Sequence, residues 1–254
     1  MATVNDIYNF LDSIAPFDTQ ESWDNSGFLV GNPDQEVHKI ALALDVTMDT
    51  LRQAEAFGAD LLVSHHPVIF HPLKNVYAGT PVYYAVEHHI SIISAHTCWD
   101  VAEGGVSDVL AAVIGLQDVR PILPGENGIC MLRLGKLPKP AAAHDFAGVV
   151  SAALDTVVRC TEPDKIIQTV AVCGGAGASF LPDLTALGGI DCFVTGDAKH
   201  NDYLDAIDDG IVLMAGGHYE TETISIPVLR DLIQKEFPDL EYTYLESAPA
   251  TYIG

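Results

Sequence analysis

The sequence predicts an α/β protein made of two similar α/β halves, each built on a mostly parallel sheet. Apolar segments of strand length alternate with segments of helix length, which is the order typical of parallel sheets. The chain also repeats itself weakly: A-D-L-L-V-S-H-H-P at 59–67 matches I-D-C-F-V-T-G-D-A-K-H at 190–200, and I-S-I-I-S-A-H at 90–96 matches I-V-L-M-A-G-G-H at 211–218. In the first pair an acidic residue, three apolar residues and a hydroxyl residue follow one another in the same order, which indicates a duplication of one α/β unit.

The first half is expected to contain three helices and three buried strands. Threonine caps helix N-termini, proline is favoured in the first turn, and glycine ends helices. The expected elements are a helix begun by Thr3 with Ile7, Phe10, Leu11 and Ile14 on one face, a loop at 23–32, a strand at 39–45, a helix from Thr47 to Phe57 ended by Gly58, a strand at 61–64, a helix from Thr80 to about His89, and a strand at 90–95.

The second half is expected to repeat this order. A strand at 169–175 runs into a glycine turn, a helix follows at 180–187, and further strands begin at Ile190 and Ile211. The segment L-P-K-P-A-A-A at 137–143 is predicted to be a linker.

Composition excludes several classes of protein. Hydrophobic residues make up 48% of the 254 residues, yet no apolar run approaches the roughly 20 residues of a membrane span. The first eleven residues lack a basic region and contain Asp6, unlike a secretory signal, so we expect a cytoplasmic protein with no membrane association. The five cysteines form no C-x-x-C pair, which argues against a disulfide framework and a thiolate zinc site.

The charge is strongly acidic. Twelve basic and 35 acidic residues give a net charge of −23, and proteins that bind duplex nucleic acid normally carry a basic patch. We therefore expect the chain to repel nucleic acid. A surface rich in Asp and Glu also suits a high-salt cytoplasm, where ions screen self-repulsion, so a halophilic source is a hypothesis.

Histidines follow three of the predicted strands. His65 and His66 follow the strand at 61–64, and His96 and His218 follow two others. In open α/β sheets, sites form at the carboxyl ends of the strands. Pro67 restricts His66 to extended geometry, so both neighbouring rings can reach a shared space.

Two carboxylates accompany these histidines. Asp100 lies four residues after His96, and Glu222 lies four residues after His218. Residues four apart share a helical face, so His218 and Glu222 could bind one ion if Glu222 lies in the first turn of a helix. Four histidines and two carboxylates without sulfur suit Zn, Mn, Fe or Co, and Asp100 is the candidate bridge of a dinuclear site. The alternative is that these histidines are structural, and the residues alone leave both interpretations open.

Two further segments allow two interpretations each. G-G-A-G-A-S at 174–179 follows a strand and precedes a helix, so it could cradle a phosphate with its N–H groups, although a tight, closely packed turn is favoured. T-G-D-A-K-H at 195–200 places Asp197 and His200 at a strand end. These two residues line the cleft, or Asp197 caps a helix.

Six short motifs occur in order across nearly the whole chain: W-D-N-S-G, L-V-S-H-H-P, S-A-H-T-x-x-D, C-G-G-A-G, T-G-D and G-H-Y-x-x-E. Together they resemble the dinuclear metal centre family that includes the type 2 GTP cyclohydrolases I. The resemblance implies two related α/β domains, the second inserted into the first, with the metal site in the cleft between them. We place the first domain at 1–120 plus 224–254 and the inserted domain at 121–223.

The resemblance also implies the site and the assembly. It assigns two divalent ions per chain, Zn, Fe, Mn or Co, to the ligands His65, His66, Asp100, His218 and Glu222. His96 is expected beside the metals, and His96 or His200 is the candidate to shuttle protons. Cys98 stands where the family usually has asparagine, so a thiol near the metals could alter affinity or redox sensitivity. The expected assembly is a homohexameric ring, a trimer of dimers.

The implied activity is hydrolytic opening of the guanine ring of GTP, with a small-molecule nucleotide as substrate. Two alternatives stand beside it. Two metals with histidine and aspartate ligands also suit a phosphoesterase. A non-catalytic ring that binds single-stranded DNA or a protein partner is the third possibility, and the charge of −23 argues against its nucleic-acid form.

Overall fold

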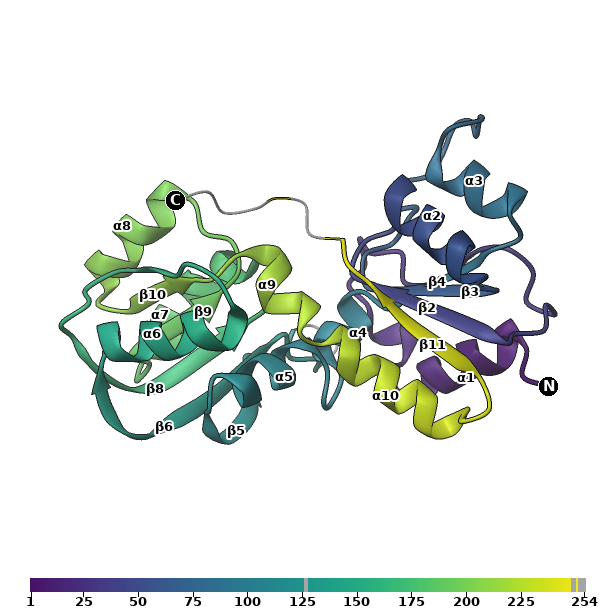
Figure 1. The fold of residues 1–254 in the computed structure, drawn as a ribbon. Coiled ribbons are helices and arrows are strands. Elements are labelled where there is room, and N and C mark those ends of the chain that lie inside the picture. Colours follow the sequence, from purple (N-terminus) through teal and green to yellow (C-terminus); the bar gives the residue numbers. More distant parts are fainter. Residues whose placement is uncertain (126–127, 248–249, 251–254) are drawn as a thin grey trace. The chain divides into compact units, whose positions relative to one another are not determined.

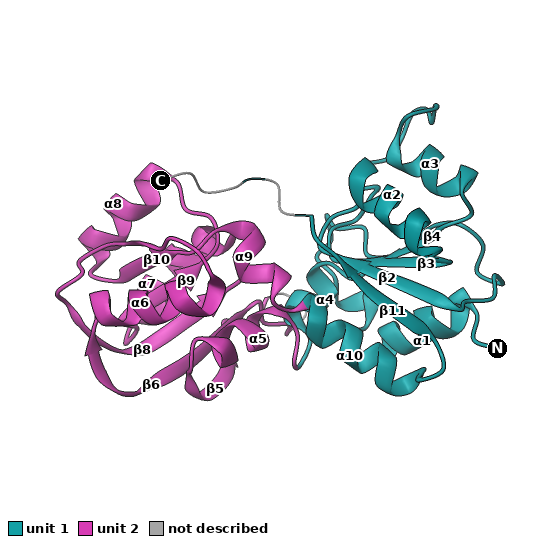
Figure 2. Ribbon diagram, in the orientation of Figure 1, with its two compact units in different colours: residues 1–103, 226–254 teal, residues 104–225 magenta. Residues whose placement is uncertain are grey.

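The computed structural model describes residues 1–125, 128–247 and 250 (Figure 1). The chain divides into two compact units, unit 1 with Met1–Glu103 and Ile226–Gly254, and unit 2 with Gly104–Ser225 (Figure 2). Unit 2 is therefore inserted between two segments of unit 1, and the predicted architecture of two α/β units is confirmed. No helix of the described residues is long and apolar enough to cross a membrane.

Unit 1 is a five-stranded sheet in the order β1-β4-β3-β2-β11. All neighbours are parallel except the edge strand β1, which pairs antiparallel with β4. Helices α2 and α3 cover one face and α1 and α10 the other (Figure 1). Its elements are α1 (Val4–Ile14), a 3-10 turn (Phe17–Thr19), β1 (Gly27–Val30), β2 (Lys39–Ala43), α2 (Met48–Phe57), β3 (Leu61–Ser64), α3 (Pro81–Glu87), β4 (Ser91–Ser94), α4 (Thr97–Val101), α10 (Ile226–Glu236) and β11 (Glu241–Leu245).

Unit 2 is a six-stranded sheet in the order β5-β6-β8-β9-β10-β7. The central strands β8, β9 and β10 are parallel, and the other pairs are antiparallel. Side chains of α5 and α6 pack on one face and those of α7 and α8 on the other. Its elements are α5 (Val106–Val113), β5 (Gln117–Ile122), β6 (Leu132–Ala142), α6 (Ala143–Leu154), β7 (Arg159–Cys160), β8 (Ile166–Cys173), a 3-10 turn (Gly177–Phe180), α7 (Leu181–Leu187), β9 (Cys192–Thr195), α8 (His200–Asp209), β10 (Val212–Ala215) and α9 (His218–Thr223).

Local capping signals set the ends of the first two helices. The Thr3 hydroxyl accepts a hydrogen bond from the Asp6 backbone N–H, and the Asp6 carboxylate accepts one from the Thr3 backbone N–H. Thr47 caps α2 in the same reciprocal way, and Gly58 ends α2 in the left-handed conformation, at φ 79°. These ends agree with the predicted ones because each depends on residues within one turn of the chain.

The duplication appears as one hydrogen-bond pattern that both units share. In unit 1 the Asp60 carboxylate accepts hydrogen bonds from the backbone N–H groups of His38 and Lys39, at 2.7 and 3.0 Å. In unit 2 the Asp191 carboxylate accepts from two consecutive N–H groups of β8, at 2.9 and 2.8 Å. Each aspartate precedes the middle parallel strand of its sheet, so the acidic residue of the repeat joins two strands in both units.

Two predicted segments differ in the structure. The segment 23–32, predicted to be a loop, contains strand β1, which forms because β4 supplies an antiparallel partner at a distance along the chain. The segment 137–143, predicted to be a linker, is the end of β6 and the start of α6. Its prolines are exposed, and the pairing of β6 with β8 shifts register between Lys136 and Ala141, where a strand tolerates proline.

The unit boundaries fall at 103/104 and 225/226, whereas the predicted ones are 120/121 and 223/224. Residues 104–120 lie in unit 2 because α5 packs on β6 and β8, and because β5 pairs with β6. The second boundary lies between α9 and α10, two residues after the predicted one.

Candidate metal centre

The carboxyl end of β3 brings three imidazole rings of unit 1 together. β3 is fully buried between β2 and β4, so the residues after it emerge at the middle of the sheet edge. The ring centroids of His65 and His66 lie 4.9 Å apart, and that of His96, which follows β4, lies 5.1 and 5.4 Å from them. One ring nitrogen from each of the three lies within 4.8 Å of the others, close enough to bind a metal ion together. We call these three residues the histidine cluster.

Hydrogen bonds hold the Nδ1 side of each ring in the histidine cluster. His65 Nδ1 lies 2.9 Å from the Ala95 carbonyl oxygen, His66 Nδ1 lies 2.7 Å from Asp45 Oδ1, and His96 Nδ1 lies 2.7 Å from Asp24 Oδ1. A carbonyl or carboxylate oxygen only accepts, so each Nδ1 donates. This leaves Nε2 as the ring nitrogen available to a metal ion, since a metal-binding histidine usually donates its other ring N–H to a carboxylate or carbonyl oxygen. The chemistry of this donor set therefore fits a divalent ion.

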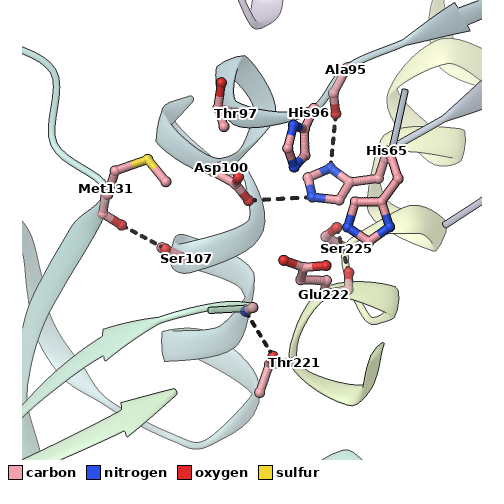
Figure 3. Close-up of polar contacts among 12 residues, drawn as sticks. His65, Ala95, His96, Thr97, Asp100, Ser107, Met131, Thr221, Glu222 and Ser225 are labelled. Atoms are coloured by element: carbon pink, nitrogen blue, oxygen red, sulfur yellow. Dashed lines mark hydrogen bonds and ion pairs between the residues drawn. The ribbon is translucent and has the colours of Figure 1, made fainter. Parts of the chain in front are cut away.

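Asp100 adds a carboxylate to the cluster. It lies on α4, where its backbone N–H bonds to the His96 carbonyl, and it is 7% exposed. Its Oδ1 lies 3.6 Å from Nε2 of the fully buried His65 (Figure 3). Carboxylate oxygens and imidazole nitrogens are both common metal ligands, so a cation that binds both would stabilise this arrangement.

Asp24 holds His96 in place from a loop of the N-terminal segment. Its side chain is 0% exposed and also accepts hydrogen bonds from the Ser26 hydroxyl and from the hydroxyl and backbone N–H of Thr97. Burial alone would raise the pKa of Asp24, but the hydrogen bonds from His96 and Thr97, the charge of His96 and the bond from Ser26 lower this pKa well below its ordinary value. Asp24 is thus an ionised, buried acceptor for His96.

Cys98 lies beside these groups, and its surroundings disfavour the thiolate. Its side chain is fully buried in α4. Burial raises the pKa of the Cys98 thiol to about 12, although a hydrogen bond with Ser26 opposes the rise. The thiolate is the nucleophile and the metal ligand, so Cys98 is a packing residue in the described chain. The altered metal affinity or redox sensitivity expected of this position stays a prediction.

Unit 2 contributes one histidine and one carboxylate on the same face of α9. His218 Nε2 lies 3.2 Å from Glu222 Oε2, as the spacing of four predicts, and His218 Nδ1 lies 2.8 Å from Asp197 Oδ2. The hydrogen bond to Glu222 raises the pKa of His218 to about 9; burial opposes this, and the charge of Glu222 and the hydrogen bond to Asp197 support it. In the metal-free protein the imidazole is therefore protonated at both nitrogens, and an ion that binds Nε2 must displace a proton.

The glycine turn after β8 packs closely against Glu222. The N–H groups of Gly175 and Gly177 donate to the hydroxyls of Thr221 and Thr195, at 3.1 and 3.0 Å. A Cβ on Gly175, whose φ is 60°, would lie 2.0 Å from Glu222 Oε1. Since both N–H groups serve the packing of unit 2, these bonds favour the interpretation as a tight turn over that as a phosphate cradle.

The two remaining predicted residues, His200 and Asp197, have different surroundings in the structure. His200 begins α8, is exposed, and belongs to none of the groups of potential metal ligands found among the described residues. Asp197 bonds to His218, whereas α8 is capped by Lys199 and Asp202, so the interpretation of Asp197 as a cap is wrong. Sequence reasoning missed Asp24 and Asp45 as partners of histidines. Asp45 is the last residue of a predicted buried strand, which is a usable signal, and Asp24 lies in the W-D-N-S-G motif.

Comparison with known proteins places the chain among similar sequences and folds. A family model described as Duf34/NIF3 (NGG1p interacting factor 3) matches residues 2–250. A "GTP cyclohydrolase 1 type 2 homolog" of Streptomyces coelicolor is 33% identical over 87% of this chain and 82% of its own. A "GTP cyclohydrolase 1 type 2" of Helicobacter pylori is 32% identical over 87% of this chain and 88% of its own. The crystal structure of a Staphylococcus aureus hypothetical protein superposes with a TM-score of 0.90, at 27% identity and 99% coverage of both chains.

Proposed function

The chain belongs to the Duf34/NIF3 family, and from that premise we propose that it is a divalent-metal-dependent hydrolase that opens the guanine ring of GTP. The observation that carries the proposal is the histidine cluster, in which every Nδ1 is held by an oxygen acceptor and one nitrogen of each ring lies within 4.8 Å of the others. A structural histidine needs no such shared orientation, whereas metal-binding histidines are oriented in this way by their outer partners.

The proposed ligands are those that the family resemblance implies. They bind two ions per chain and are His65, His66 and Asp100 of unit 1 and His218 and Glu222 of unit 2. Nitrogen and oxygen donors without sulfur suit Zn, Fe, Mn or Co. The separate geometry of each unit supports this set, since Asp100 faces His65 in unit 1 and Glu222 faces His218 in unit 2.

Divalent ions in such a site supply activation of water and polarisation of the substrate. The chain's own contribution is a proton acceptor. His96 Nδ1 donates to Asp24, so Nε2 is the ring atom that exchanges a proton, and the buried, ionised Asp24 stabilises the imidazolium that forms when His96 takes a proton. We assign His96 the role of general base and acid. His200, exposed on α8, is not needed for this role.

The substrate assignment comes from the relatives. The names of the Streptomyces coelicolor and Helicobacter pylori proteins refer to GTP cyclohydrolase activity, and the chain matches both over 87% of its length. We propose for this chain the reaction and the nucleotide substrate that those names imply, and the homohexameric assembly that the family resemblance implies.

Metal content and turnover test the proposal in one experiment. Elemental analysis of protein purified without chelator or affinity tag should find about two transition-metal ions per chain. GTP should then lose the absorption of its intact purine, and an assay for free phosphate should stay flat. His65→Ala should lose both metal and turnover, whereas His144→Ala, an exposed histidine of α6, should keep both.

The other outcomes decide between the alternatives. Phosphate release without ring opening would replace the proposal by a phosphoesterase. Metal content near zero that does not rise on reconstitution would overturn it and favour a binding protein.

A further inference from the structure

We propose that Trp23 and Phe70 form an aromatic wall that stacks the planar ring of the substrate beside the histidine cluster. This inference rests on the proposed function, because it assigns a binding surface for the base of a nucleotide at the same site. It adds the chemical class that the wall selects: a flat, nitrogen-containing aromatic ring rather than a sugar or a phosphate.

The wall lies directly against the histidine cluster. The Trp23 and Phe70 ring centroids are 5.9 Å apart, and those of Trp23 and His96 are 6.0 Å apart. Phe70 lies 6.2 Å from His96. Both aromatic rings meet His96 edge-on, at 72° and 71°. A ring stacked on the wall would therefore have its edge close to the general base.

Both rings of the wall are more exposed than large aromatic side chains usually are. Trp23 is 55% exposed and Phe70 is 40% exposed. The two rings are tilted by 46°, so they do not stack on one another. Large aromatic side chains normally bury most of their surface, and this pair leaves ring surface uncovered next to a set of metal-binding groups.

Hydrogen bonds hold the wall in position. Trp23 lies in the loop before β1 and Phe70 in the loop after β3. The Asn25 side-chain amide donates to the Ile69 carbonyl at 2.6 Å, which ties the two loops together one residue away from Phe70. The Glu21 backbone N–H donates to the Thr97 hydroxyl at 2.9 Å, which ties the first loop to the residue after His96. Both rings are thus anchored to the cluster that they flank.

Binding by stacking also suits a protein with few positive charges. The chain has 12 basic and 35 acidic residues, so it offers few cations to attract the phosphates of a nucleotide. Stacking on an uncharged aromatic ring needs no cation and works with any base that has a π face. An acidic protein that binds a nucleotide therefore gains most by holding the base, and leaves the phosphates towards solvent or the metal ions.

Tryptophan fluorescence measures this binding independently of turnover. The chain has two tryptophans: Trp23, 55% exposed, and Trp99, fully buried. Guanosine and GTP, titrated into the metal-loaded protein, should quench the exposed emission. Inorganic triphosphate and ribose 5-phosphate should not. Trp23→Leu should remove the quench and weaken guanosine binding roughly 5- to 150-fold, the range expected for one stacked base. Trp23→Phe should keep most of the affinity.

Tyr77→Ala is the matched control, because Tyr77 is 63% exposed in the same loop as Phe70 but has no ring contact with the cluster among the described residues. Its guanosine affinity should equal that of the parent. Isothermal titration of the variants with guanosine gives the affinities without fluorescence.

Three results would overturn the wall. Guanosine could fail to quench, Trp23→Leu could bind guanosine as well as the parent, or Trp23 emission could respond to dilution of the protein and not to guanosine, which would mean that a second copy covers the wall. Guanosine binding to Trp23 without GTP turnover would keep the wall and remove the proposed function. GTP turnover with an unchanged KM in Trp23→Leu would keep the proposed function and remove the wall.

Discussion

The strand ends of unit 1 and unit 2 share one backbone scaffold but carry different residues. In both units an aspartate joins the first two parallel strands, and the strand after it pairs in the same register. Past these strands, unit 1 has His65 and His66, whereas unit 2 has Gly196 and Asp197. Unit 1 therefore carries its imidazoles on the strand ends, and unit 2 carries His218 and Glu222 on a helix.

Close packing accounts for this difference. A Cβ on Gly196 would lie 2.6 Å from the Gly175 carbonyl oxygen, and a Cβ on Gly175 would collide with Glu222. Unit 2 thus uses glycine at its strand ends so that α9 can approach them. One duplicated scaffold provides two kinds of donor: nitrogen-rich in unit 1, and a histidine paired with a carboxylate in unit 2.

Among the variants, Gly175→Ala should have the largest effect on the difference between the two units. The added Cβ would displace the Glu222 carboxylate, so metal affinity should fall about 100-fold or more, at least the loss seen when supporting partners are removed. Titration calorimetry with Zn measures it. Gly210→Ala is the control, because Gly210 also has a left-handed φ, 74°, but its Cβ would meet only the Lys165 amine at 3.7 Å.

Both glycine variants should lose roughly 1–2 kcal/mol of stability from the left-handed backbone alone, which thermal unfolding would show. Equal metal affinity in the two variants would mean that the Glu222 position does not matter for binding.

Asp24→Asn should have the next largest effect. It removes the ionised acceptor that fixes His96 and receives four further hydrogen bonds. We expect turnover to fall about 10- to 100-fold and the unfolding free energy to fall by about 1–3 kcal/mol. Steady-state kinetics and urea unfolding measure the two. Asp34→Asn, at an exposed position of unit 1, should change neither.

Asp197→Asn in unit 2 sharpens the comparison, because the Asp197 side chain is 61% exposed and that of Asp24 is 0% exposed. Its effect on turnover should be the smaller of the two, since an exposed acceptor is replaced by water. A larger effect than that of Asp24→Asn would contradict the ranking of the two units.

The titration of His218 should distinguish unit 2 by pH. With a pKa raised from 6.5 to about 9, its ion pair contributes stability that is complete below pH about 6.5 and is lost as pH rises through about 9. NMR titration of the metal-free protein should show this midpoint, and Asp197→Asn should lower it. Zn binding at neutral pH should release the proton, which calorimetry in buffers of different ionisation enthalpy detects. A midpoint near 6.5 would show that Glu222 does not hold the proton.

Salt should have the smallest effect on the difference between the two units, because it acts on both of them. We propose that the net charge of −23 is an adaptation to high salt, so KCl should raise the unfolding midpoint by screening self-repulsion. A stability curve against KCl tests this. Full stability at low salt would count against it.

The sequence by itself determined the local elements and the positions of the candidate ligands. Helix α2 begins after Thr47 and ends at Gly58 as predicted, because its caps act within one turn. His218 and Glu222 share a face because their spacing of four on a helix requires it. The aspartates of the repeat predicted the duplication, since the same short motif serves the same strand junction twice.

Only the tertiary structure decided which groups support those ligands. Asp24 and His96 are 72 residues apart, and Asp45 and His66 are 21 apart, so no local pattern pairs them. Strand β1 forms only because β4 is available to pair with it, and residues 104–120 join unit 2 only because β6 and β8 bury α5. Capping and periodicity depend on neighbours along the chain, whereas the tautomer of a histidine depends on whichever acceptor the fold brings to its Nδ1.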